Sequence, residues 1–93
     1  MAKCNVLLSK TATKELNSLD NTMQERIRAS LKELESEPFQ PRPKADIKKL
    51  HKMSKHQFYR LRVGGYRIIY AIENTDVKVT RIIARGKGYE WLD

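Results

Sequence analysis

A pair of adjacent glycines, Gly64 and Gly65, constrains the fold of this chain more than any other feature of its sequence. It separates two runs, residues 58–63 and 66–70, in which apolar and basic residues alternate. Alternation with a period of two around a two-residue glycine turn predicts a β-hairpin. The pairs that this turn would set opposite each other are Val63 with Tyr66, Arg62 with Arg67, Leu61 with Ile68 and Arg60 with Ile69.

Side chains alternate between the faces of a sheet, so this hairpin would have one apolar and one basic face. The residues expected on the core face are Tyr59, Leu61, Val63, Tyr66, Ile68 and Tyr70. The residues expected on the opposite face are Arg60, Arg62, Arg67 and Ile69. Like charges directly opposite each other destabilise a sheet, so the Arg62–Arg67 pair favours an anionic partner on this face. A basic face that is merely solvated is the alternative.

The net charge of the chain is +8, and its distribution supports an anionic partner. Residues 1–39 carry as many acidic as basic groups, so the whole excess lies in residues 40–93. Such asymmetry points to nucleic acid or another polyanion, although an acidic protein would also fit the surface. The length of 93 residues predicts a single domain, residues 1–93, with one modest core.

Several classes of protein are excluded by composition. The sequence has no run of about 18 apolar residues, so we expect no membrane span, and the N-terminus lacks a signal-peptide pattern, so we expect a cytoplasmic protein. Cys4 is the single cysteine, which rules out an internal disulfide and a cysteine-rich metal site. His51 and His56 lie in a lysine-rich stretch without metal-ligand spacing, and no Gly-rich phosphate loop occurs. We therefore expect no metal and no cofactor.

The first third of the chain predicts one short strand and two helices. Residues 4–8 alternate in hydropathy, which indicates a strand, and Ser9 can cap a helix over residues 10–19. Thr22 and Glu25 have the spacing of a capping box, which predicts a second helix that ends before the first proline of the chain. The apolar residues expected to face the core from this helix are Met23, Ile27, Leu31 and Leu34.

Closely spaced prolines in residues 39–46 predict an irregular connector, and a lysine-rich loop over residues 44–55 follows it. Beyond the hairpin, residues 77–84 are rich in β-branched residues and predict a last strand. A three-residue turn before it would pair Ile69 with Arg81 and send Arg81, Ile83 and Arg85 to the basic face; a two-residue turn would reverse the faces.

This order of elements predicts an α+β fold, β-α-α-β-β-β. Two N-terminal helices would pack on one face of a four-stranded, mainly antiparallel sheet. The other face of the sheet would carry the arginines.

The remaining candidates for chemistry are cationic, and arginine binds phosphate in a bidentate manner. The basic residues expected near an anionic ligand are Arg60, Arg62, Arg67, Arg85, Lys87, Lys49, Lys52 and Lys55. Tyr89 and Trp91 add rings on which a base can stack. Such a surface can simply bind nucleic acid. It can also cleave RNA without metal, by attack of a ribose 2′-OH on the neighbouring phosphate, with arginines stabilising the developing charge. The proton donor or acceptor would be Tyr89, a lysine or a histidine.

Residues 59–70 read Tyr-Arg-Leu-Arg-Val-Gly-Gly-Tyr-Arg-Ile-Ile-Tyr, with Lys49-Leu50 before them and Arg85-Gly86-Lys87 after them. In its layout, nearly the whole chain resembles the RelE/ParE toxin superfamily. The resemblance implies a type II toxin with a four-stranded sheet on two helices, and a cognate, acidic, RelB-like antitoxin that wraps it. For RelE members it also implies metal-independent cleavage of mRNA in the ribosomal A site, with mRNA and rRNA as partners.

The resemblance also implies four catalytic residues. Arg67 matches an arginine that stabilises the phosphate, and Arg60 takes the place of a strand lysine. Arg85 resembles the tail arginine of archaeal-type members, and Tyr89 is the nearest match to the C-terminal tyrosine of the family. Phe58 is a departure, because better-known RelE members have a second strand lysine there. The residues expected to bind RNA are Lys49, Lys52, Lys55, Arg62 and Lys87.

Two alternatives remain open within this resemblance. A ParE-type toxin inhibits DNA gyrase and leaves RNA intact. A non-catalytic RNA-binding member of the fold is the other alternative, and Phe58 supports it. For the ribonuclease, replacing Arg67 by alanine should abolish cleavage without harming the fold, because the side chain is expected on the solvent face.

Overall fold

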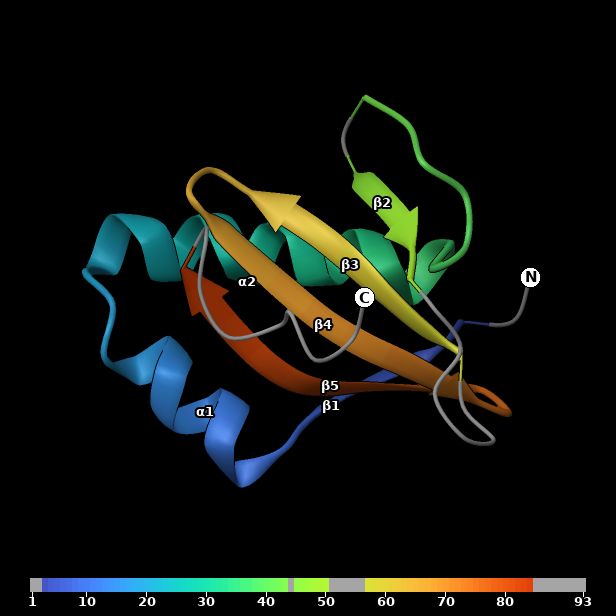
Figure 1. Ribbon diagram of the computed structural model, residues 1–93, viewed down its shortest axis with the longest axis horizontal. Helices are drawn as coiled ribbons and strands as arrows, with labels where there is room; N and C mark the ends of the chain where they lie inside the picture. The colour runs from blue at the N-terminus through green and yellow to red at the C-terminus, as the bar shows by residue number, and fades with distance from the viewer. Residues whose placement is uncertain (1–2, 44, 51–56, 85–93) are drawn as a thin grey trace.

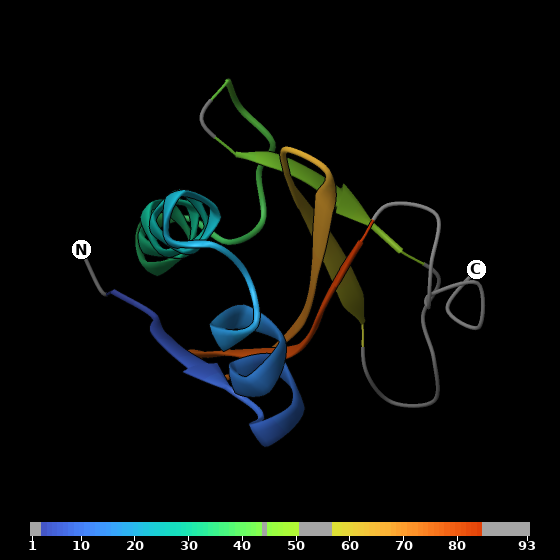
Figure 2. The same cartoon turned by 90° about the vertical axis from the view of Figure 1, so that its left-hand side faces the viewer.

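The computed structural model of the protein describes residues 3–43, 45–50 and 57–84. Within these residues it has an α+β fold, in which α1 and α2 pack on one face of a five-stranded mixed sheet of order β1-β5-β4-β3-β2 (Figures 1 and 2). The bounds of the elements are β1 Asn5–Leu8, α1 Lys10–Asn17, α2 Asn21–Ser36, β2 Asp46–Lys49, β3 Phe58–Val63, β4 Tyr66–Glu73 and β5 Asp76–Ala84. The predicted class is confirmed, but the prediction of four strands was one too few because it missed β2.

The predicted hairpin is confirmed residue by residue. In the antiparallel pair β3–β4, Val63 lies opposite Tyr66 and Arg62 lies opposite Arg67. Gly64 has a φ of +56°, which a two-residue turn of this kind requires and which glycine adopts without strain. A side chain at Gly64 would also meet the Arg26 guanidinium, because its Cβ would lie 3.1 Å from Nη1.

The core lies between this sheet and the helices. Ala12 and Leu16 of α1 and Ile27, Leu31 and Leu34 of α2 are buried against the sheet. The sheet residues in the same cluster are Ile47, Leu61, Val63, Ile68, Tyr70, Val77, Val79 and Ile82. The helical stripe predicted from the sequence is confirmed, with Met23 only partly buried at its edge.

The helix ends differ in part from the prediction. Ser9 caps α1 as expected, because its Oγ accepts from the backbone N–H of Ala12 at 3.0 Å. The cap of α2 is Asp20, whose Oδ1 accepts from the N–H of Met23 at 2.8 Å. The predicted capping box at Thr22 was therefore wrong, because an aspartate two residues earlier is an equally good cap and starts the helix sooner.

The stretch after α2 is more ordered than its prolines suggest. Arg42 donates from Nη2 to the Glu33 carbonyl and from Nη1 to the Glu37 carbonyl, which satisfies two carbonyls near the end of α2. The Tyr70 hydroxyl donates to the Pro38 carbonyl at 2.7 Å in the buried interior. After this stretch the chain forms β2, which pairs antiparallel with β3. We had expected an irregular connector and loop at these residues.

The last hairpin contains both of the registers considered from the sequence. Its turn has two residues, since Glu73 pairs with Asp76. A β-bulge then shifts the register, so that Tyr70 pairs with Val79 and Ile69 pairs with Arg81. Thr80 is the extra residue, and its carbonyl accepts from Oγ of Ser9 at 2.9 Å.

The bulge decides which way the end of β5 faces. Val77 and Val79 join the core beneath the helices, and Ile83 lies in an apolar cluster on the other face. Arg81 does not add a free charge there, because its Nε and Nη2 donate to Glu15 of α1 at 3.0 and 2.8 Å. This bond raises the pKa of Arg81.

Candidate nucleic-acid interface

The sheet face away from the helices carries Arg60, Arg62 and Arg67, and we refer to it as the arginine face. Arg60 and Arg62 alternate along β3 with the core residue Leu61, and Arg67 lies directly opposite Arg62 on β4. The hairpin alone is enough to place these side chains on one face. The predicted grouping of the arginines is therefore confirmed.

The arginine face is less open than expected. Arg60 and Arg67 are only 7% and 6% exposed, whereas Arg62 is exposed. An apolar cluster of Leu50, Ile69 and Ile83, with Phe58 packed against it, accompanies them. The expectation that Arg67 lies on the sheet face away from the helices was right, and the expectation that this side chain is exposed to solvent was wrong.

Asp46, for which the sequence suggested no role, balances part of this charge. The Asp46 carboxylate of β2 lies 3.6 Å from Nη1 of Arg60 and 3.7 Å from Nε of Arg62. Asp46 pairs with Arg62 in the sheet, so β2 brings it to the arginines. Part of the compensation that the facing arginines need is therefore internal.

The hydrogen bonding of the Arg67 guanidinium is incomplete among the described residues. Its Nε and Nη1 are buried and find no hydrogen-bond partner in the described part of the chain. Its strand neighbours are Arg62 on one side and Ile83 on the other. A buried guanidinium with unsatisfied donors is costly, so this position strongly favours an anion with acceptor oxygens.

The pairing of β2 with β3 places Lys48 and Lys49 on opposite faces of the sheet, and the predicted one, Lys49, is not on the arginine face. Lys49 pairs with Tyr59, whose ring packs against the core, so Lys49 lies on the helix side of the sheet. Lys48 pairs with Arg60 and lies on the arginine face instead. The alternation of Asp46 and Lys48 with Ile47 was the available signal, but the preceding prolines obscured it.

Some of the predicted site residues belong to parts of the chain that the structure does not describe. Arg85, Tyr89, Lys52, Lys55 and Lys87 all lie outside the described residues, as do both histidines. Among the described residues, no group of three potential metal ligands occurs. In the same part of the chain, no helix has the length and apolar character to cross a membrane.

The fold and this surface define a small basic α+β domain with an arginine-lined sheet face. Residues 6–89 match the family model of the ParE toxin of type II toxin–antitoxin systems, parDE. Toxin RelE3 of Methanocaldococcus jannaschii is 30% identical over 87 residues, which cover 94% of this chain and 97% of that protein. The chain therefore belongs to the RelE/ParE toxin superfamily of type II toxin–antitoxin systems.

Solved structures agree with this assignment. The archaeal RelE–RelB complex from Pyrococcus horikoshii OT3 contains a chain that superposes with a TM-score of 0.79 at 32% identity, covering 92% of this chain and 99% of that one. A chain of the RelB–RelE antitoxin–toxin complex from Methanococcus jannaschii gives a TM-score of 0.70 at 26% identity, with coverages of 94% and 99%.

Proposed function

We propose that this toxin is a ribosome-dependent endoribonuclease that cleaves mRNA in the ribosomal A site and so inhibits translation in the cytoplasm. The observation that carries the proposal is the state of Arg67, a buried guanidinium with two unsatisfied nitrogens on a basic sheet face. A phosphate oxygen would satisfy these donors and neutralise the buried charge. The stabilisation would be greatest when negative charge builds up on the phosphate during the reaction.

The proposed reaction is attack of a ribose 2′-oxygen on the adjacent phosphorus, with departure of the 5′-oxygen of the next nucleotide. The products are a 2′,3′-cyclic phosphate and a 5′-hydroxyl, and no metal is required. Arg67 and Arg60 would stabilise the phosphate charge, while Arg62 and Lys48 would hold the RNA backbone. A proton must leave the 2′-hydroxyl and another must reach the leaving oxygen, and Tyr89, a lysine or a histidine would carry out these transfers. Arg85 would stay protonated and add positive charge beside the phosphate.

The proposed partners are the ribosome with its mRNA and rRNA, and an acidic RelB-like antitoxin. The two archaeal chains most useful for comparison were both solved in complex with a RelB antitoxin. A net charge of +8 suits an acidic partner as well as RNA. An antitoxin that covered the arginine face would prevent RNA from reaching it.

A reconstituted translation reaction tests the activity. With purified ribosomes and a defined mRNA, we expect cuts in phase with the codons, and no cuts when ribosomes are left out. Arg67→Ala should reduce the cleavage rate by at least about 100-fold, because loss of one charge-stabilising donor has effects of this order. Arg28→Ala, on the exposed side of α2, is the matched control and should cleave at the wild-type rate.

The family model favours one alternative, since its description is that of ParE toxins. If this chain is a ParE-type toxin, it should inhibit supercoiling by DNA gyrase and leave mRNA intact on ribosomes. If it is a non-catalytic RNA-binding member, it should do neither and still bind RNA. The supercoiling assay and the cleavage assay together separate the three functions.

A further inference from the structure

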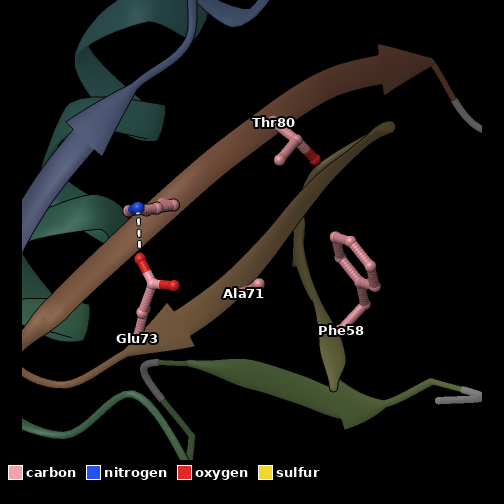
Figure 3. A pocket seen from close by; sticks show the side chains of 5 residues that line it. Phe58, Ala71, Glu73 and Thr80 are labelled. Atoms are coloured by element: carbon pink, nitrogen blue, oxygen red, sulfur yellow. Dashed lines mark hydrogen bonds and ion pairs between the residues drawn. The ribbon is translucent and has the colours of Figure 1, made fainter. Parts of the chain in front are cut away.

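A hollow of about 220 Å³ opens on the arginine face, at the end of the sheet away from the Gly64–Gly65 turn (Figure 3). Its lining side chains come from β3, β4 and β5, which are adjacent in the sheet. They are Phe58, Ala71, Glu73, Lys78 and Thr80. The proposed reaction does not use any of them.

The depth of the hollow comes from a small residue between larger ones. Ala71 pairs with Phe58 on one side and with Lys78 on the other, so the methyl group of Ala71 forms the floor. Phe58 packs against the cluster of Leu50, Ile69 and Ile83, which holds its ring in place as one wall. The hollow therefore combines an apolar floor with a supported aromatic ring.

The rim of the hollow is polar. Glu73 and Lys78 form an ion pair at one end of the hollow (Figure 3). The Lys78 ammonium donates a hydrogen bond to the Glu73 carboxylate, which raises the pKa of Lys78. The Thr80 hydroxyl, on the bulge of β5, lies at the other end and bonds to the Ile69 carbonyl at 3.3 Å. An occupant would thus find hydrogen-bond donors and acceptors around its edge and apolar contact on its flat side.

These properties match a nucleobase, and we infer that the hollow binds one base of a single-stranded RNA, stacked on Phe58. Proteins that bind single strands combine a basic surface for the backbone with aromatic rings for the bases. Phe58 and Arg60 are two residues apart on one face of β3, a separation of about 6.6 Å, so a phosphate near Arg60 places the next base within reach of the ring.

The size and the surroundings of the hollow support the same occupant. Pockets for drug-sized ligands begin at about 300 Å³, so a hollow of about 220 Å³ suits a single planar ring system. The basic residues along the same face, Lys48, Arg60, Arg62 and Arg67, favour a ligand that carries a negative backbone. The inference rests on the proposed function in one respect, namely that the arginine face binds RNA.

Binding of a short 2′-O-methyl oligonucleotide to the full chain, followed by fluorescence anisotropy, tests the inference. This probe cannot be cut, because its 2′-oxygen carries a methyl group and cannot attack the phosphate. Phe58→Leu keeps an apolar side chain but removes the ring, and Ala71→Met fills the hollow from its floor. Phe58→Tyr and Ala71→Ser are the matched controls, since they keep the ring and the space.

We expect Phe58→Leu and Ala71→Met each to weaken binding about tenfold, which is the size of one base-stacking contact, and both controls to stay within about twofold. In a series of oligonucleotides that each lack one base at a different position, the wild type should bind one member about tenfold more weakly, namely the one whose missing base would occupy the hollow. At that position Phe58→Leu should lose nothing further, because the two changes remove the same contact. Thermal melting of each variant shows that it is folded, and Ala71→Met provides the test if Phe58→Leu is not.

Equal binding by the wild type and the folded hollow variants would overturn the base site, and so would a failure of the wild type to bind the probe. The failure of the nuclease proposal looks different. Base-dependent binding without cleavage on ribosomes would leave the base site standing and remove the nuclease. If the hollow variants instead bind the probe and cleave mRNA like the wild type, the base site is overturned and the nuclease proposal stands.

Discussion

The carboxylate of Asp46 lies 3.6 Å from the guanidinium of Arg60, across the boundary between β2 and β3. The same carboxylate also lies 3.7 Å from Nε of Arg62, which itself faces Arg67 across the hairpin. The Asp46 carboxylate is thus an anion of the protein itself among arginine side chains that repel one another. It offsets part of the cross-strand repulsion, and under the proposed function it competes with the phosphates of RNA for the arginines.

Replacing Asp46 by asparagine should strengthen RNA binding about two- to fivefold, because the phosphate no longer competes with an internal carboxylate. The free energy of unfolding should change by less than about 1 kcal/mol, since the Asp46 side chain is 56% exposed, its ion pairs are long at 3.6 and 3.7 Å, and asparagine keeps an oxygen that can accept from the arginines. Anisotropy with the uncleavable oligonucleotide and urea unfolding measure the two effects. Glu25→Gln makes the same charge change on the exposed side of α2 and should leave affinity unaltered; an equal gain in both variants would mean that only net charge matters.

Arg67→Met should abolish cleavage and at the same time stabilise the fold by about 1–2 kcal/mol. The reason is that an apolar side chain of similar length removes a buried charge with unsatisfied nitrogens, and such replacements are often stabilising. The cleavage assay and a thermal melt of the same preparation test both parts. A large drop in melting temperature would show that Arg67 has a structural partner and would contradict this account of its burial.

Tyr70→Phe should cost about 1–2 kcal/mol at neutral pH, because the buried Pro38 carbonyl loses its donor. Burial, followed by the nearby Tyr59, raises the pKa of Tyr70 well above its ordinary value. The unfolded chain then loses the tyrosine proton at a lower pH than the folded chain, so stability falls as the pH rises above about 10. The difference between wild type and Tyr70→Phe should therefore shrink above that pH. Urea unfolding from pH 8 to 11 measures it, and a constant difference would contradict the shift.

Glu15→Ala should destabilise the protein by about 2–3 kcal/mol, because Glu15 accepts hydrogen bonds from the Arg81 side chain and from the backbone N–H of Ile82. The Ile82 N–H belongs to the edge of β5 beyond the part that pairs with β1, and an uncovered strand edge promotes self-association. Urea unfolding and sedimentation at several protein concentrations measure the two effects. Glu25→Ala, on the exposed face of α2, is the control and should be neutral in both.

The parts of the fold that were predicted correctly depend on local information. The Gly64–Gly65 turn sets the register of β3 and β4, because a two-residue turn fixes every pair that follows it. The stripe of α2 follows from helical periodicity in the same way. The proposed base site was not predicted. Phe58 and Arg60 share a face of one strand, which is a local signal, but Ala71 comes to lie beside Phe58 only when β4 pairs with β3.

The parts that were missed depend on contacts between distant residues. The strand β2 has few strand-forming residues and is held by pairing with β3. The bulge at Thr80 depends on Ser9, whose hydroxyl bonds to the Thr80 carbonyl and whose N–H bonds to the Val79 carbonyl. Nothing in the neighbourhood of Thr80 along the chain signals either bond.

By itself, the sequence determined that Arg60, Arg62 and Arg67 share one face of a hairpin, because alternation along a strand and a tight turn are local properties of the backbone. Only the tertiary structure decided that Arg60 and Arg67 are buried, that Asp46 reaches the arginines, and that Lys48 rather than Lys49 joins them. Burial and pairing depend on which strands lie side by side, and those neighbours come from segments far apart in the chain.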